Sequence, residues 1–229
     1  MRAGRASWVG AAALSLVAVS GLRAQQRLLL SGATLLDGTG AAPVRDSRIA
    51  VVDGRISCVS GPGGCPAQPG DRVLDLSGQW ISPGLIDTHV HLPLALVAHA
   101  GLERSQRLRF ALGITTVRDA GSRSTVELLA ARAHAEDGSR PIPRLVVASQ
   151  STPEDVARLG ADSTATVVSR LVAAGVDAIK IKEPFTSEDW RGQIRAARAA
   201  GLPAFGHTWG SVNEVFTREA IAEGISGIS

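Results

Sequence analysis

The pattern of hydrophobic and polar positions changes near residue 83. Between residues 27 and 82, short apolar runs alternate with turn-forming glycine, aspartate and proline. Asp53-Gly54 stands between two of these runs, which is the pattern of a tight hairpin. We therefore expect a small, sandwich-like β-domain over residues 27–82. Its strands are predicted from the apolar runs, at Leu28–Leu30, Ala33–Leu36, Arg48–Val52, Arg55–Val59 and Arg72–Leu76.

After Pro83 a longer repeat begins, in which an alanine-rich stretch ends at a glycine and an apolar run follows. A glycine ends a helix well because it readily adopts the left-handed turn required there. This alternation of helix and strand predicts a parallel sheet built from βα units. The glycines in question are Gly113, Gly175, Gly201 and Gly224.

Residues 83–229 give five such strands, the first at Leu85–Asp87, and the start of a sixth. A complete (β/α)8 barrel has eight strands and roughly 250 residues. We therefore expect an α/β fold, with an incomplete (β/α)8 TIM barrel following the β-domain.

The first residues have the pattern of an export signal. Arg2 and Arg5 precede an uncharged run, Ala6–Leu22, and Ala24 is a small residue suited to cleavage. We expect a signal peptide over residues 1–24 and an exported protein, periplasmic or secreted. A membrane anchor formed by an uncleaved signal is the alternative. The run is short for a membrane span, and no second one follows it.

Composition argues against a nucleic-acid partner and leaves open whether the two cysteines form a disulfide. The formal charge is only +3 and aromatic residues are 3% of the chain, so we expect no nucleic-acid partner. Cys58 and Cys65 lie on either side of a Gly-Pro-Gly-Gly turn. An oxidising compartment permits a disulfide between them. Two unrelated thiols are the alternative.

Two histidines close the first strand after the β-domain, in the run Pro83-Gly84-Leu85-Ile86-Asp87-Thr88-His89-Val90-His91. Side chains of a strand alternate between its faces, so His89 and His91 point the same way. The C-terminal ends of barrel strands are where active sites form. The pair is therefore predicted to bind a metal ion, and the nearby Asp87 is a candidate to support a ligand or contact substrate.

The chain contains only two lysines, both in one predicted strand. Lys180 and Lys182 are expected to face the barrel interior, where lysine is almost never found without a partner. Unlike arginine, lysine can lose its proton. We expect Lys180, held neutral, to react with CO₂ to form a carbamate that can bridge two metal ions. Alternatively, the lysines reach water or pair with Glu183 or Asp119.

The remaining histidines differ in their expected roles. His207 closes the fifth strand, where it is well placed to bind a second metal ion, or else serves as a loop histidine. His99 is a candidate substrate contact, although a place on a helix surface is favoured. His134 falls in a helical stretch and is expected on a solvated face.

On these motifs the chain resembles the amidohydrolase superfamily, in its imidazolonepropionase-like and Xaa-Pro dipeptidase-like branch. The resemblance covers residues 27–229. It is carried by Gly38-Thr39-Gly40, residues 83–91, residues 113–119, Asp177–Lys180 and His207.

The resemblance implies a composite domain of metal-dependent hydrolases at residues 27–82 and a hydrolase barrel at residues 83–229. It implies metal ligands at His89, His91, carbamylated Lys180 and His207. Lys182, His99, Asp87 and Asp119 remain candidates for supporting roles or substrate contacts. The implied cofactor is a pair of Zn²⁺ ions, with Mn²⁺, Co²⁺ or Fe²⁺ as alternatives.

The implied activity is hydrolysis of amide or cyclic-amide C–N bonds in a dipeptide or other small molecule, by a metal-activated water. The resemblance further implies a histidine after the sixth strand and a catalytic aspartate after the eighth. Neither stands in this sequence, so no catalytic residue is assigned and we expect an N-terminal fragment. The alternative, of another class, is a truncated, non-catalytic fragment that binds a metal or ligand.

Overall fold

A computed structural model describes most of the chain as two compact units that divide after Pro83. The predicted signal peptide at residues 1–24 lies outside the described residues. Within the described ranges no helix is both long and apolar enough to cross a membrane. These ranges are 26–92, 100–122, 124–138, 140–151, 164–181, 187–207 and 214–228.

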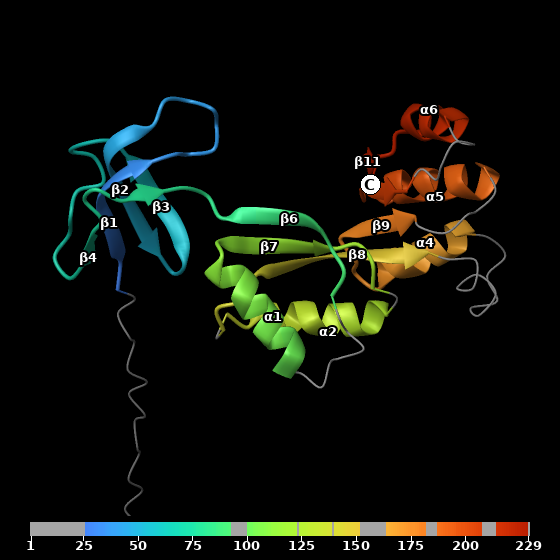
Figure 1. Cartoon of the computed structure of the whole chain (residues 1–229), viewed down its shortest axis with the longest axis horizontal. Coiled ribbons are helices and arrows are strands. Elements are labelled where there is room, and N and C mark those ends of the chain that lie inside the picture. The colour runs from blue at the N-terminus through green and yellow to red at the C-terminus, as the bar shows by residue number, and fades with distance from the viewer. Residues whose placement is uncertain are drawn as a thin grey trace, which may run out of the picture. The chain divides into compact units, whose positions relative to one another are not determined.

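The first unit is one small mixed sheet rather than two facing layers (Figure 1). Its strand order is β3-β2-β1-β4, and β5 also pairs with β1. β1 runs antiparallel to β2 but parallel to β4 and β5. The strands are β1 (Leu28–Leu35), β2 (Val44–Val52), β3 (Arg55–Ser60), β4 (Arg72–Asp75) and β5 (Trp80–Ile81).

The two apolar runs expected as separate strands at 28–30 and 33–36 form the single strand β1. Its pairing with β2 shifts register between Ser31 and Ala33, around Gly32, whose φ is +88°. Such a bulge inserts a residue without ending the strand. The Asp53-Gly54 hairpin is confirmed, because both residues have the positive φ of a type I′ turn, 54° and 70°.

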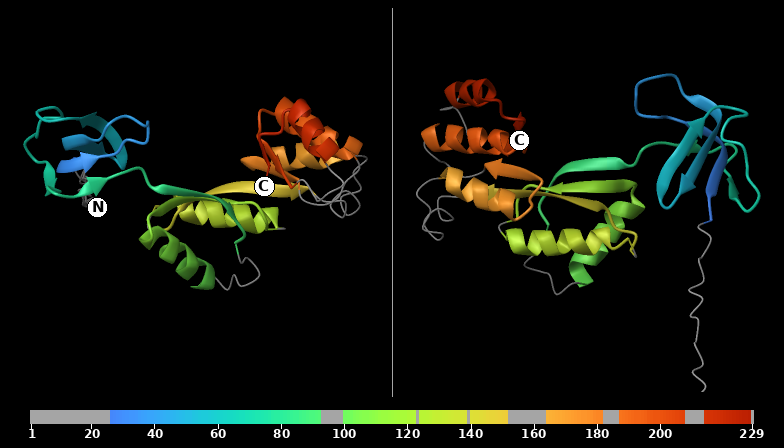
Figure 2. Two further views of the ribbon diagram at one scale, coloured as in Figure 1. Left: turned by 45° about the horizontal axis from the view of Figure 1, so that its top comes forward. Right: turned by 180° about the vertical axis from the view of Figure 1, so that it is seen from behind.

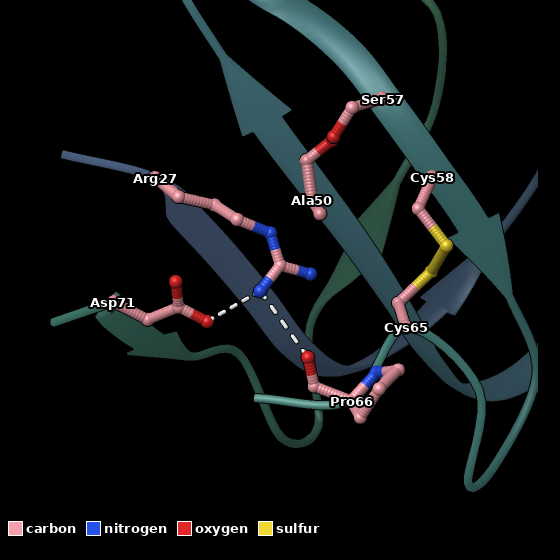
Figure 3. The surroundings of a disulfide bond; sticks show 7 residues. All are labelled: Arg27, Ala50, Ser57, Cys58, Cys65, Pro66 and Asp71. Carbon is pink, nitrogen blue, oxygen red and sulfur yellow. Dashed lines mark hydrogen bonds and ion pairs between the residues drawn. A yellow bond between two sulfur atoms is a disulfide. The ribbon is translucent and has the colours of Figure 1, made fainter. Parts of the chain in front are cut away.

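A disulfide and an ion pair hold the long loop between β3 and β4 (Figure 3). Cys58 in β3 is bonded to Cys65, the pairing that the sequence left open. Arg27, at the start of β1, donates to Asp71 Oδ2 at 2.6 Å and to the carbonyl of Pro66 at 3.2 Å. The disulfide therefore ties the middle of the loop to β3, and Arg27 ties the loop to the residue that precedes β1.

The second unit is a parallel sheet whose six described strands follow one another in chain order, β6 to β11. This order is that of a partial (β/α)8 barrel, as the sequence predicted. The strands are β6 (Leu85–Val90), β7 (Ile114–Asp119), β8 (Arg144–Ser151), β9 (Ala178–Ile181), β10 (Ala204–Gly206) and β11 (Gly227–Ile228). The described helices are α1 (Ala100–Ala111), α2 (Thr125–Glu136), α4 (Thr164–Ala173), α5 (Ser187–Ala199) and α6 (Glu214–Glu223).

The glycines expected to end helices do so. Each has a φ between 72° and 87°, and each amide donates to a carbonyl three residues earlier. Residues with a Cβ adopt this backbone conformation at a cost, so these positions favour glycine. They are Gly113, Gly175, Gly201 and Gly224.

The hydrophobic core of this unit lies between the sheet and its helices. Figure 2 shows the described helices along one side of the sheet. Alternate strand residues such as Val147 and Ile179 point to that side and are fully buried with Leu128, Val168 and Ile194. The intervening residues of each strand therefore point to the inner face of the partial barrel.

Replacing Cys58 and Cys65 by serine is expected to reduce the free energy of unfolding of the β unit by about 2–3 kcal/mol, the effect of opening a short closed loop. Thermal unfolding with and without reductant measures it. The wild-type midpoint should fall on reduction, and the midpoint of the double variant should not respond. Insensitivity of the wild-type midpoint to reductant would contradict the structural role of this bond.

Candidate metal centre

Three histidine rings from two distant strands meet at the C-terminal edge of the parallel sheet. His89 is the penultimate residue of β6, His91 follows that strand, and His207 follows β10. The His89 ring centroid lies 5.3 Å from that of His91 and 5.8 Å from that of His207. In a flat sheet, β6 and β10 would be about 19 Å apart, because four strand spacings of ~4.8 Å separate them. The sheet therefore curves until these strand ends face each other.

The spacing of the first two imidazoles fits a shared metal ion. Their Nε2 atoms are 3.3 Å apart. Two nitrogen ligands at 2.0–2.1 Å from a tetrahedral zinc ion are separated by about 3.3–3.4 Å. In the structure this is the distance of a hydrogen bond between the two rings, and it equals the separation of two nitrogen ligands on one zinc ion. Imidazole nitrogen is a ligand that Zn²⁺ accepts readily. The pair formed by His89 and His91 thus has the spacing that a metal site requires.

Within the described part of the chain, the histidine, cysteine, aspartate and glutamate side chains form no group of three or more positioned to hold a metal ion. The third ring, His207, is therefore a neighbour of the pair rather than a ligand already in place. His99 and Lys182 lie outside the described residues. Lys180 is the remaining candidate ligand from the sequence.

Lys180 is fully buried in β9, between β8 and β10. Its neighbours Ile179 and Ile181 point to the helices and belong to the core. Lys180 therefore points to the inner face, as the sequence predicted. Its partners in register on the adjacent strands are Gln150 and Phe205.

Burial is the largest of the effects that lower the pKa of His89. The charge of Lys180 in its ammonium form and that of His91 lower this pKa further. Arg118 acts in the same direction, and Asp87 opposes them. These effects favour the neutral imidazole, whose free lone pair is what a metal ion binds.

Asp119, expected to support the site, organises the backbone beside His91. It is fully buried at the end of β7. Its Oδ2 accepts from the Leu92 amide at 2.6 Å and the Ser122 hydroxyl at 2.7 Å. Its Oδ1 accepts from the amides of Gly121 and Ser122 at 3.1 and 2.8 Å. Leu92 directly follows His91, so this carboxylate fixes the backbone next to His91, just after the end of β6.

Two further contacts position the histidine pair. A Cβ at Gly121 would overlap the ring of His91, so only glycine leaves room for the imidazole in this orientation. Asp87 accepts a hydrogen bond from the backbone amide of His89 at 3.2 Å. Asp87 therefore supports the strand end through the backbone.

The polar and aromatic side chains on the inner face around Lys180 were not predicted from the sequence. Gln150 is nearly fully buried beside it. Phe205 lies on its other side, and the guanidinium carbon of Arg118 is 3.7 Å from the centre of the Phe205 ring. The alternation of side chains between the two faces of a strand could have identified them, because these residues occupy inward positions of β7, β8 and β10.

Two curated relatives are similar in sequence to part of the chain, while no family model matches it. An imidazolonepropionase of Hyphomonas neptunium is 35% identical over 135 residues, which cover 58% of this chain and 27% of that protein. An imidazolonepropionase of Stenotrophomonas maltophilia is 34% identical over 168 residues, covering 72% and 35%. The chain thus spans about a third of the length of these relatives.

Solved structures share the fold. An amidohydrolase superposes with a TM-score of 0.72 at 23% identity, over 89% of this chain and 60% of that one. A Xaa-Pro dipeptidase with methionine bound in its active site gives a TM-score of 0.69 at 21% identity, over 89% and 61%. These likenesses bear out the partial barrel preceded by a small mixed sheet.

Asp119→Asn is expected to reduce the free energy of unfolding by about 2 kcal/mol or more, because an amide NH₂ replaces an oxygen that accepts two buried hydrogen bonds. Chemical denaturation measures the change.

Asp75→Asn is the matched control. Asp75 also accepts from the amide and hydroxyl of a serine two residues later, Ser77, but it is exposed. Its substitution should cost less than about 1 kcal/mol. Equal, small effects at both positions would remove the organising role of Asp119.

Proposed function

Because this chain belongs to the amidohydrolase superfamily, we propose that its barrel supplies metal ligands to a hydrolase of amide or cyclic-amide C–N bonds. The observation that carries the proposal is the approach of three histidine rings from β6 and β10 on the inner face that also holds the buried Lys180. Members of this superfamily are typically metal-dependent. The chain spans only part of its relatives, so the proposal concerns the activity of the whole protein.

His89 and His91 would hold one divalent ion, for which their 3.3 Å nitrogen separation is suitable. His207 would hold a second, and carboxylated Lys180 would bridge the two. Zn²⁺ fits nitrogen and carboxylate ligands, with Mn²⁺, Co²⁺ and Fe²⁺ as alternatives. When bound, such ions lower the pKa of a water molecule and polarise the carbonyl under attack.

Carboxylation converts the neutral amine of the buried Lys180 into an anionic ligand. The neutral Nζ of Lys180 forms an N–C bond with dissolved CO₂, one C=O electron pair moves to oxygen, and a proton is released to water. Complete burial favours the neutral amine over the ammonium. The nearby positive charge of Arg118 favours an anion at this place.

The names of the relatives support a proposal for the substrate class. Two of them are named imidazolonepropionases, and one solved neighbour is a Xaa-Pro dipeptidase. We propose that the substrate is a small cyclic amide or a dipeptide.

We further propose that the protein is exported. The signal pattern of residues 1–24 supports this, and so does the Cys58–Cys65 disulfide, since such bonds persist in oxidising compartments. The mass of the mature protein tests it: loss of the first ~24 residues is expected, and retention of the full N-terminus in an exported protein would favour an uncleaved anchor.

Alanine substitution of His89 or Lys180 in the full-length protein is expected to lower kcat/KM on the order of a thousandfold, because the metal ions supply several kcal/mol of transition-state stabilisation. Activity is measured on prolyl dipeptides and cyclic amides, and bound metal by elemental analysis. Two ions per wild-type chain are expected, and fewer in either variant.

His134→Ala is the matched control, since His134 lies exposed in α2 and interacts with Arg140. It should keep both metal and activity. Normal activity in Lys180→Ala would remove the bridging role. Failure of the metal-loaded wild type to hydrolyse any member of the panel would overturn the proposed activity.

A further inference from the structure

A glutamine side chain is buried on the inner face of the partial barrel, and no hydrogen-bond partner for it is found in the part of the chain that the structure describes. Gln150 in β8 is only 4% exposed. Neither its Nε2 nor its Oε1 has a partner among the residues that the structure describes. A buried amide without partners is costly, so such groups in folded proteins usually await a water, an ion or a ligand.

Gln150 lies directly beside Lys180. The two residues are partners in register in the parallel pairing of β8 with β9. Their neighbours Ser149 and Ile179 also pair and are buried on the opposite face, toward the helices. Gln150 and Lys180 therefore share the inner face at the separation of adjacent strands, ~4.8 Å.

The other neighbour of Lys180 in register is apolar. Phe205 in β10 has no polar side-chain atom, and the Arg118 guanidinium lies over its ring. Of the two side chains that flank Lys180, only Gln150 can exchange hydrogen bonds with it.

The hydrogen-bonding chemistry of the two side chains matches only after modification. An amide presents both donors and an acceptor, whereas a lysine ammonium has three donors and no acceptor. The ammonium can therefore satisfy Oε1 and leaves Nε2 without a partner. The neutral amine has a lone pair, but its single nitrogen cannot align with both amide atoms at once. A carbamate carries an N–H next to a negatively charged oxygen, so it can donate to Oε1 and accept from Nε2.

We propose that Gln150 is a positioning residue that binds the carboxylated form of Lys180 through both atoms of its side-chain amide. This inference rests on the proposed function, because it presupposes the carbamate. It adds a protein partner that retains the modification and orients the bridging oxygens. A hydrogen bond to a charged acceptor is stronger than one between neutral groups, so the amide favours the carbamate over the free amine.

The test is the carbamate itself rather than activity. Full-length protein is loaded with Zn²⁺ and ¹³C-labelled bicarbonate, and the carbamate carbon is followed by NMR as bicarbonate is varied. In Gln150→Met, which keeps the length of the side chain but removes its amide, the half-saturating bicarbonate concentration should rise by about tenfold or more.

Gln193→Met is the matched control. Gln193 lies in α5, outside the sheet, and is likewise fully buried with both amide atoms unpaired among the described residues. Its substitution should leave the bicarbonate dependence unchanged. An equal shift in this variant would mean that loss of any buried amide loosens the site, and would overturn the specific pairing.

Gln150→Glu is a second test, which remains available if the methionine variant does not fold. This substitution keeps the size of the side chain. A glutamate carboxylate can pair with the Lys180 ammonium but repels a carbamate, so the variant should fold and lose the carbamate signal. Retention of the wild-type signal in Gln150→Glu would overturn the proposal.

Two outcomes separate the role of Gln150 from the carboxylation of Lys180. If the wild type shows a carbamate and Gln150→Met has the same bicarbonate dependence, the role of Gln150 is wrong and the bridging lysine stands. If the wild type shows no carbamate at any bicarbonate concentration, both are wrong.

Discussion

The approach of His89 to His207 across the inner face is the constraint on which the candidate centre depends. The strands that carry these residues are separated by three others, and only strong curvature brings their rings to 5.8 Å. That curvature is maintained from outside, where apolar residues of the sheet are buried against the helices. Packing on the outer face thus determines whether the inner face can gather ligands.

On the inner face of the curved sheet, the orientation of individual side chains depends on buried polar contacts. Asp119 accepts four hydrogen bonds around the turn beside His91, and Gly121 leaves space for that imidazole. Lys180 is buried deeper in the sheet, between an aromatic ring and an amide. His91 and Lys180 therefore each have neighbours that fix their position, as the ligands of metal centres in proteins generally require.

Local pattern predicted much of this arrangement, because alternation along one strand is enough to place His89 and His91 on one face. Recurring helix-ending glycines likewise predicted the βα units. Contacts set by register between distant segments could not be predicted: the pairing of Gln150 with Lys180 depends on how β8 aligns with β9. The sequence could not decide whether Cys58 and Cys65 are bonded for the same reason, since spacing along the chain does not determine whether two thiols meet.

The most direct measurement is anomalous diffraction at the zinc edge from crystals of the full-length protein grown with Zn²⁺ and bicarbonate. Our account predicts a zinc peak about 2.1 Å from Nε2 of both His89 and His91, a second peak beside His207, and density for a carboxylate extending from Nζ of Lys180 between them. Zinc bound elsewhere, with the two imidazoles of β6 turned away from any ion and an unmodified Lys180, would contradict it.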